Sequence, residues 1–155
     1  MRGYTYTGDS RTRVARARGF EVPMSPKKTY EVLNAIRGKP LAEARRFLEG
    51  VVELTQPVKF RRYNQETAHK RGIGPGRYPK KVAKNLLGIL QNAESNADYE
   101  GLDADLLYIY VAACSRGRIR KASMPRAQGR ATAWNEQTTH VEIVLRERAG
   151  AEGAE

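Results

Sequence analysis

The glycine-rich stretch GIGPGR, residues 72–77, has the spacing closest to that of a nucleotide-binding loop. A dinucleotide-binding fingerprint would need a glycine where Arg77 stands, and a P-loop would continue with Gly-Lys and then Ser or Thr. The chain continues instead with Arg77, Tyr78 and Pro79, so neither pattern is met. We therefore expect these glycines to let a loop approach another backbone closely.

The acidic run at residues 94–105 is the next candidate, as a calcium site. Counted from Asp98, the sixth position is Asp103 and the twelfth is Ile109. An EF-hand needs glycine and glutamate at those two positions. The acids are better explained as a cap and a turn at the end of a helix.

The histidines and the cysteine also lack the spacing of a site. His69 and His140 are far apart in the chain, without ligand spacing. Cys114 has no sequence signature of a nucleophile. We expect His140 on the surface of a strand and Cys114 as a small strand residue. We expect no enzyme, no cofactor and no metal site.

The basic residues offer a different chemistry, the binding of a polyanion. The 155-residue chain has 28 Lys and Arg against 17 Asp and Glu, a formal net charge of +11. Such a chain needs an anionic partner or must tolerate its own repulsion. Nucleic acid is the first candidate partner, and an acidic membrane surface is the second.

The charge is gathered in three patches. Residues 1–30 hold seven Lys or Arg, residues 59–84 hold nine, and residues 106–135 hold six with no acid. This distribution favours a surface that contacts a polyanion at several places over an ordinary solvated surface.

No targeting signal is evident in the sequence. Cys114 is the single cysteine, which excludes an intrachain disulfide and fits a reducing compartment. The first residues show no signal-peptide apolar core, and no apolar run reaches the ~18 residues of a membrane span. We expect a soluble cytoplasmic protein with no membrane partner.

The motif Pro-Lys-Lys occurs twice, at residues 26–28 and 79–81, each time where a helix is expected to begin. Lysines in a first turn face the positive end of the helix dipole, which costs some tenths of a kcal/mol. A bound phosphate would reverse that sign, because backbone N–H groups and lysines both favour it. We interpret Lys27, Lys28, Lys80 and Lys81 as phosphate contacts, although so short a motif can recur by chance.

Three helices are predicted to position these residues. The first lies within residues 24–40, with Ser25 as N-cap, Pro26 at the first position and Gly38 near its end. The second lies within residues 40–54 and the third within 78–97, each with an apolar stripe at helical spacing. Residues 55–77 between them are predicted to be a long loop, which suggests a function or disorder.

Strands are predicted at residues 106–113 and 139–147, with a third at about residues 19–22. Residues 114–138 keep a period of two, so we expect the two longer strands to continue as a basic hairpin with its turn near residues 121–125. At roughly 3.3 Å per residue, ten residues each way would reach about 33 Å. The alternative is a disordered basic loop.

The return arm alternates between large and small side chains. Arg126, Gln128, Arg130, Thr132 and Trp134 share one parity, whereas the other parity carries only alanines and Gly129. We expect the first side to face RNA and the second to keep the hairpin thin.

Four motifs carry a family resemblance: PRAQGRA (125–131), SPKK (25–28), NAESNA (92–97) and HVEIVL (140–145). Together they resemble the universal large-subunit ribosomal protein family L-twenty-two. FRRYNQ (60–65) with GRYPKK (76–81) is similar to the archaeal and eukaryotic branch of that family. The resemblance covers about residues 1–147.

The resemblance implies an α+β fold: a small three-stranded antiparallel sheet packed by about three helices, with a long protruding β-hairpin. Length and residue patterns predict a single domain over residues 1–155, with a globular body at 1–113 and 139–147, the hairpin at 114–138 and a disordered tail at 148–155. The resemblance also implies a structural constituent of the large ribosomal subunit, cytoplasmic within the ribosome.

Partners follow from the same resemblance. They are large-subunit ribosomal RNA, neighbouring large-subunit proteins near the peptide exit tunnel and, transiently, the nascent peptide, because the hairpin would line the tunnel. The expected hairpin tip is Lys121, Ala122, Ser123, Met124, Pro125 and Arg126. The expected RNA-binding residues are Lys27, Lys28, Arg61, Arg62, Lys70, Arg71, Arg77, Lys80, Lys81, Lys84, Arg116, Arg118, Arg120, Lys121, Arg126, Gln128, Arg130 and Trp134.

The alternative function is a free-standing basic nucleic-acid-binding protein, for instance on chromatin. No helix-turn-helix or zinc-finger spacing supports it.

Removing the hairpin arginines should separate RNA binding from stability. The variant replaces five residues by Ser: Arg116, Arg118, Arg120, Arg126 and Arg130. We expect weaker RNA binding in a filter-binding titration and a nearly unchanged melting temperature, because a protruding hairpin adds little to a core. A large drop in melting temperature would show that the hairpin belongs to the core.

Overall fold

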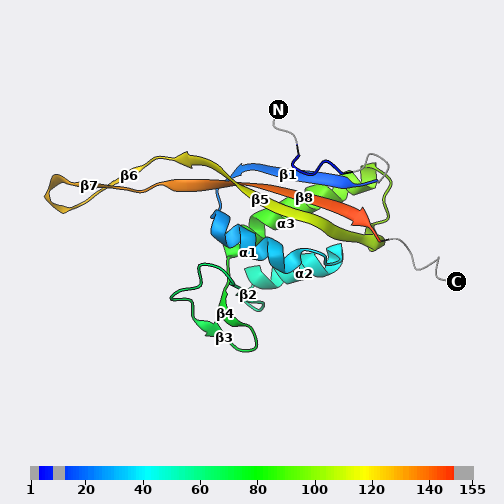
Figure 1. Ribbon diagram of the computed structural model, residues 1–155, viewed down its shortest axis with the longest axis horizontal. Coiled ribbons are helices and arrows are strands. Elements are labelled where there is room, and N and C mark those ends of the chain that lie inside the picture. Colours follow the sequence, from blue (N-terminus) through cyan, green and yellow to red (C-terminus); the bar gives the residue numbers. More distant parts are fainter. Residues whose placement is uncertain (1–3, 9–12, 149–155) are drawn as a thin grey trace.

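A three-stranded antiparallel sheet forms the centre of the protein in the computed structural model, which describes residues 4–8 and 13–148 (Figure 1). Its strands are β1 (Ala15–Val22), β8 (Glu136–Glu147) and β5 (Leu107–Arg120), in the order β1-β8-β5. β8 is central because it pairs with a strand on each side, and its residues 138–145 are all buried, including the polar residues Thr138, Thr139, His140 and Glu142. The predicted strands are confirmed, and each is longer than predicted.

Three helices cover one face of this sheet (Figure 1). They are α1 (Pro26–Ile36), α2 (Leu41–Val52) and α3 (Lys80–Tyr99), as predicted. Their apolar stripes meet the inward side chains of the sheet in one core, whose largest fully buried members include Leu33, Leu48, Leu86, Leu90, Ile109, Ile143 and Leu145. Each such side chain contributes about 1.5–3 kcal/mol relative to exposure. The predicted α+β fold class is confirmed.

The other face of the sheet is covered in part by the N-terminal segment. The Glu142 carboxylate on β8 accepts hydrogen bonds from the backbone N–H of Thr5 at 2.8 Å and of Tyr6 at 3.0 Å. The Tyr6 ring then meets the Tyr110 ring edge-on, with centroids 5.7 Å apart. These contacts explain how a carboxylate is buried in the middle of the sheet.

His140 is buried beside this segment, so its predicted place at the surface of a strand is wrong. Its ring stacks on Phe20 with centroids 4.6 Å apart, and its Nδ1 accepts a hydrogen bond from the backbone N–H of Glu21. The strand alternation suggested an outward side chain, but here the outward face is itself covered.

A second, small sheet occupies the segment predicted as a loop, residues 55–77. Its strands are β2 (Val58–Lys59), β4 (Gly74–Arg77) and β3 (His69–Lys70), in the order β2-β4-β3. A Cβ at Gly76 would lie 3.3 Å from the carbonyl oxygen of Val58 on the paired strand. Gly76 thus serves the close backbone approach that we expected, whereas Gly72 and Gly74 have open space around them and adopt positive φ values of 80° and 74°.

β5 and β8 continue past the helices as a hairpin (Figure 1). Their pairing runs to Arg120 opposite Glu136. Beyond it, β6 (Ser123–Pro125) pairs with β7 (Ala131–Ala133). Every residue from 118 to 137 is exposed, so the body buries none of this arm.

The hairpin turn lies at residues 126–130, so the predicted turn at residues 121–125 is wrong. The backbone N–H of Arg126 donates to the carbonyl of Arg130 at 2.8 Å, and Gln128 and Gly129 have φ of 60° and 67°. Residues 123–125 are extended and paired, as suits the fixed φ of proline. Of the six predicted tip residues, Lys121 to Pro125 belong to the outgoing arm, and Arg126 alone borders the turn.

The same turn interrupts the predicted alternation. Residues 127–129 form the turn and not a strand, so Arg126, Gln128 and Arg130 do not share one strand face. The alternation holds only for the arm that follows, residues 131–133.

At the base of the hairpin the two paired strands approach each other closely. β5 has an irregularity between Arg116 and Ile119. The Thr138 hydroxyl donates to the carbonyl of Arg118 at 2.7 Å. A Cβ on Gly117 would lie 2.3 Å from that hydroxyl oxygen, so only glycine fits beside Thr138.

Of the tail predicted at residues 148–155, only Arg148 is described, and its backbone N–H donates to the carbonyl of Leu106 at 3.0 Å. Residues 149–155 lie outside the described part of the chain. Within the described part, no helix has the length and apolar character to span a membrane.

Truncating a core leucine should destabilise the body strongly. Leu90 on α3 is completely buried, so Leu90→Ala should lower the free energy of unfolding by about 2–5 kcal/mol through reduced burial and a cavity. Leu106→Ala is the matched control, because Leu106 is 44% exposed and should cost much less. Urea denaturation measures both, and equal destabilisation would contradict the assignment of the core.

Candidate nucleic-acid interface

The predicted binding residues all lie at the surface: every one is exposed except Lys70, which is half-buried. They come from the starts of α1 and α3, the small sheet and the hairpin. Two clefts at the base of the hairpin bring several of them together.

The first cleft, called here the lysine cleft, lies between the starts of α1 and α3. It has a volume of about 370 Å³, and its lining includes Ser25, Lys28, Lys81 and the hairpin residues Asn135, Glu136 and Gln137, so one acid lies beside the two lysines. The two Pro-Lys-Lys turns, distant in sequence, therefore border the same cavity. Convergence of two cationic helix starts on one cleft favours bound phosphate over a chance recurrence of the motif.

The two helix starts, of α1 and α3, carry no acid in the first turn and no side-chain cap of their own within the described residues. Ser25 was predicted as the N-cap of α1, and it takes that position through its backbone alone. The positive ends of both helices add to the charge of Lys28 and Lys81.

The second cleft, called here the aromatic cleft, lies on the other side of Gln137, which lines both cavities. Its volume is about 450 Å³. Lys27, Arg62 and Arg116 line it, one from each of the three basic patches. Patches that are separate in the sequence therefore each contribute a cation to one cleft near the hairpin base.

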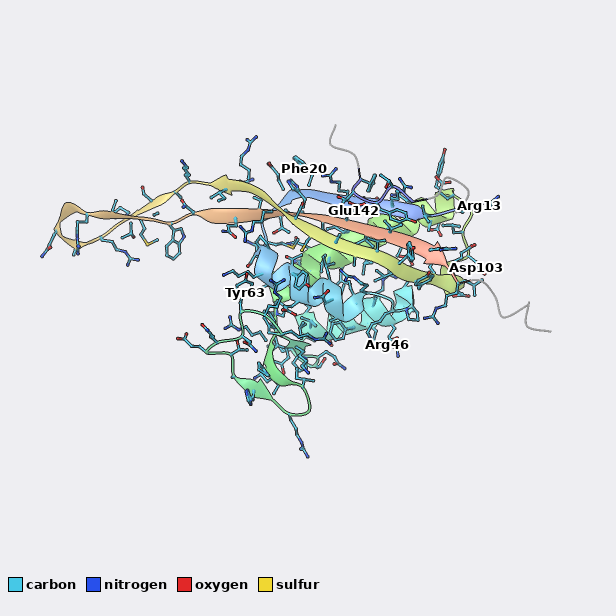
Figure 2. All side chains as sticks on the ribbon, viewed as in Figure 1. Arg13, Phe20, Arg46, Tyr63, Asp103 and Glu142 are labelled. Atoms are coloured by element: carbon cyan, nitrogen blue, oxygen red, sulfur yellow. The ribbon has the colours of Figure 1, made fainter. Side chains whose placement is uncertain are left out.

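Two tyrosines hold the cations of the aromatic cleft. The Lys27 ammonium lies 4.3 Å from the centre of the Tyr63 ring, and the Arg62 guanidinium lies 5.5 Å from that of Tyr30. Figure 2 places Tyr63 near the end of the helical layer from which the hairpin departs. Such contacts fix the positions of cations without neutralising them.

Two side chains that line the aromatic cleft, Tyr30 and Cys114, have pKa values shifted from their ordinary values. Hydrogen bonds from Asn34 first and from Arg62 second lower the pKa of the Tyr30 hydroxyl below its ordinary value. Burial raises the pKa of the Cys114 thiol, and the nearby charge of Arg37 opposes this only partly. Cys114 is thus a protonated, half-buried strand residue, as expected.

Other predicted residues lie away from the two clefts. The hairpin turn and the β3–β4 pair, in which Lys70 ends β3 and Arg71 follows it, project from the body in different directions (Figure 1). Arg77 has an internal role as well, because its Nε donates to the hydroxyl of Thr67 at 3.1 Å. Arg118 lies 3.8 Å from the Glu21 carboxylate. The candidates therefore form a central surface with two outlying arms.

Sequence reasoning missed Tyr30, Glu31 and Tyr63, all of which line the aromatic cleft. An aromatic residue beside a basic pair, as in the stretch Arg61-Arg62-Tyr63, was a usable signal for one of them. Metal binding has no support here, because the described residues contain no group of three His, Cys, Asp or Glu side chains suited to it.

Comparison with known proteins identifies the family. Residues 17–146 match the family model described as Ribosomal protein L22p/L17e. The chain belongs to this family. The resemblance carried by the four sequence motifs is thereby confirmed, and a family of structural ribosomal proteins agrees with the expectation that the chain is not an enzyme.

Curated relatives match nearly the whole chain. The large ribosomal subunit protein uL22 of Archaeoglobus fulgidus is 45% identical over 148 residues, which cover 94% of this chain and 96% of the relative. The protein of the same name from Staphylothermus marinus is 45% identical over 93% of this chain and 96% of the relative. That of Thermofilum pendens is 46% identical over 87% and 90%. All three are archaeal, in agreement with the predicted branch.

Removing the two cleft lysines should weaken RNA binding in a salt-dependent way. We expect Lys28→Ser with Lys81→Ser to reduce the slope of log affinity against log salt by roughly 0.7–0.9 for each phosphate that the variant no longer neutralises. The control, Lys39→Ser with Arg46→Ser, removes the same charge from the region of α2; neither residue lines a cleft, and Arg46 lies well away from Tyr63 (Figure 2). Equal slopes for the two variants, in filter binding to large-subunit rRNA, would contradict the assignment.

Proposed function

We propose that the chain is a structural constituent of the large ribosomal subunit that binds large-subunit rRNA through the surface around the hairpin base. The observation that carries this proposal is the convergence of the three basic patches on the two clefts, together with membership of the family. A folded RNA presents closely spaced phosphates, and a rigid arrangement of cations from several elements suits such a target.

The chemistry of the surface fits RNA in two ways. Lysines at helix starts bind phosphate as point charges, reinforced by the backbone N–H groups. Arginine forks such as Arg62 and Arg116 bind phosphate in a bidentate manner and stack on bases. The exposed Trp134, which lies part-way along the hairpin just after β7, is available for stacking on a base.

The hairpin would act in a confined space. We propose that it runs along the wall of the nascent-peptide exit tunnel, close to neighbouring large-subunit proteins and, transiently, to the nascent peptide. Its exposure from residue 118 to 137 supports this role, because an arm without packing of its own gains order from surrounding RNA and protein. The turn at residues 126–130 would then reach deepest.

Ribosome fractionation tests the proposed function. We expect the protein to co-sediment with large subunits and to remain there after a moderate-salt wash, because dissociation must break many phosphate interactions together. The measurement is a sucrose gradient of a cell lysate probed for the protein. Recovery mainly in the post-ribosomal supernatant would contradict the proposal. Equal affinity for duplex DNA and structured rRNA fragments would favour the free-standing nucleic-acid-binding protein instead.

A further inference from the structure

The aromatic cleft contains a group that a purely phosphate-binding surface would avoid. Glu31, on α1, lines the cleft and is only 3% exposed. Its charge opposes that of Lys27, Arg62 and Arg116 and would repel a phosphate that entered the cavity. A carboxylate in the floor of a cationic cleft therefore points to a ligand group that donates hydrogen bonds.

Part of the Glu31 carboxylate is already engaged. Its Oε1 accepts a hydrogen bond from the backbone N–H of Arg62 at 2.8 Å, which anchors the start of the segment after β2. An ionised carboxylate has about four acceptor positions on its two oxygens, so acceptor capacity remains for a ligand. The anchored oxygen also fixes the orientation of the other.

The rim of the cleft has the character of a stacking site. Tyr63 is 60% exposed and Tyr30 is 38% exposed, and both rings line the cavity. The Lys27 ammonium and the Arg62 guanidinium lie within 6 Å of the Tyr63 ring centre, at 4.3 and 5.8 Å. A planar, apolar ring system could lie against these tyrosines while the cations bind the charged groups attached to it.

The size of the cavity agrees with such an occupant. About 450 Å³ falls within the range of pockets that hold small organic ligands. The cleft matches three features of a nucleotide. The aromatic faces suit the plane of its base, the fixed acceptor in the floor suits an amino group on that base, and the cations at the rim suit its phosphates.

We propose that the aromatic cleft receives one unpaired nucleobase of the bound RNA, and that this base carries an exocyclic amino group. Glu31 accepts a hydrogen bond from the amino group, Tyr63 stacks on the base, and Lys27 and Arg116 contact the flanking phosphates. This rests on the proposed function for the presence of RNA and adds base recognition to a surface otherwise explained by phosphates.

The proposal distinguishes between bases. Carboxylates accept hydrogen bonds from the amino group of cytosine. Uracil presents a carbonyl oxygen at the corresponding position, which would face the carboxylate with repulsion. Stacking is tolerant of sequence, because every base has a π-face. Glu31 therefore determines the preference for cytosine over uracil, whereas Tyr63 contributes affinity for either base.

Fluorescence anisotropy with labelled, unstructured homopolymers of cytidylate and of uridylate, equal in length, tests this with the full chain. We expect the wild-type protein to bind the cytidylate probe about fivefold more tightly, at the lower end of discrimination by a side chain–base pair. Glu31→Gln should abolish this preference, because the amide keeps an acceptor for Arg62 N–H but offers a donor beside it. Tyr63→Ala should weaken binding of both probes by about tenfold.

Tyr99→Ala is the matched control, since Tyr99 is 91% exposed at the end of α3 and does not line the cleft, and it should change neither affinity. Equal affinity of the wild-type protein for the two probes, or a Tyr63→Ala variant that binds like Tyr99→Ala, would overturn the proposal. If Glu31→Gln unfolds, as circular dichroism would show, the wild-type preference and the Tyr63 comparison decide alone.

The outcome is separable from that of the proposed function. If the wild-type protein co-sediments with large subunits but shows no base preference, the base-binding proposal is refuted and the ribosomal role still stands. If the protein shows a base preference but does not associate with large subunits, base binding in the cleft is supported and the ribosomal role is refuted.

Discussion

The pairing of β8 with β1 on one side and with β5 on the other holds the whole molecule in register. β8 lies in the centre of the sheet, carries the innermost core residues and then continues without a break into the hairpin. Because register is set where both faces are covered, the buried part of β8 also determines where the exposed arm begins. The helices, the clefts and the arm take their positions from this one strand.

The distribution of charge follows from the same arrangement. The core of the body is apolar, and the cations lie on its surface, mainly around the hairpin base and along the two arms. The three ion pairs seen within the described residues involve Lys39, Arg45 and Arg118, all of them apart from the lysines of the two clefts. The free protein therefore carries a repulsion that a polyanion would relieve.

The sequence predicted those features that depend on residues close together in the chain. Pro26 and Gly38 marked α1, apolar periodicity marked α2 and α3, and the alternation of residues 139–147 marked β8. The turn was missed because the paired, extended residues 123–125 and the positive φ of Gln128 have only a weak local signal. The aromatic cleft was missed because Glu31 and Tyr63 meet only through tertiary packing, and a buried glutamate on a helix looks like any surface glutamate in the sequence.

The close contact of Gly117 with Thr138 has a mechanical consequence for the hairpin. Thr138 is the last buried residue of β8 before the exposed arm, and the turn lies about eleven residues from Gly117, or roughly 36 Å. Over that lever arm a rotation of about ten degrees at this contact would displace the turn by about 6 Å, more than the spacing of two paired strands. A single methyl group added at position 117 could therefore displace the hairpin turn at residues 126–130, although it would make no contact with that turn.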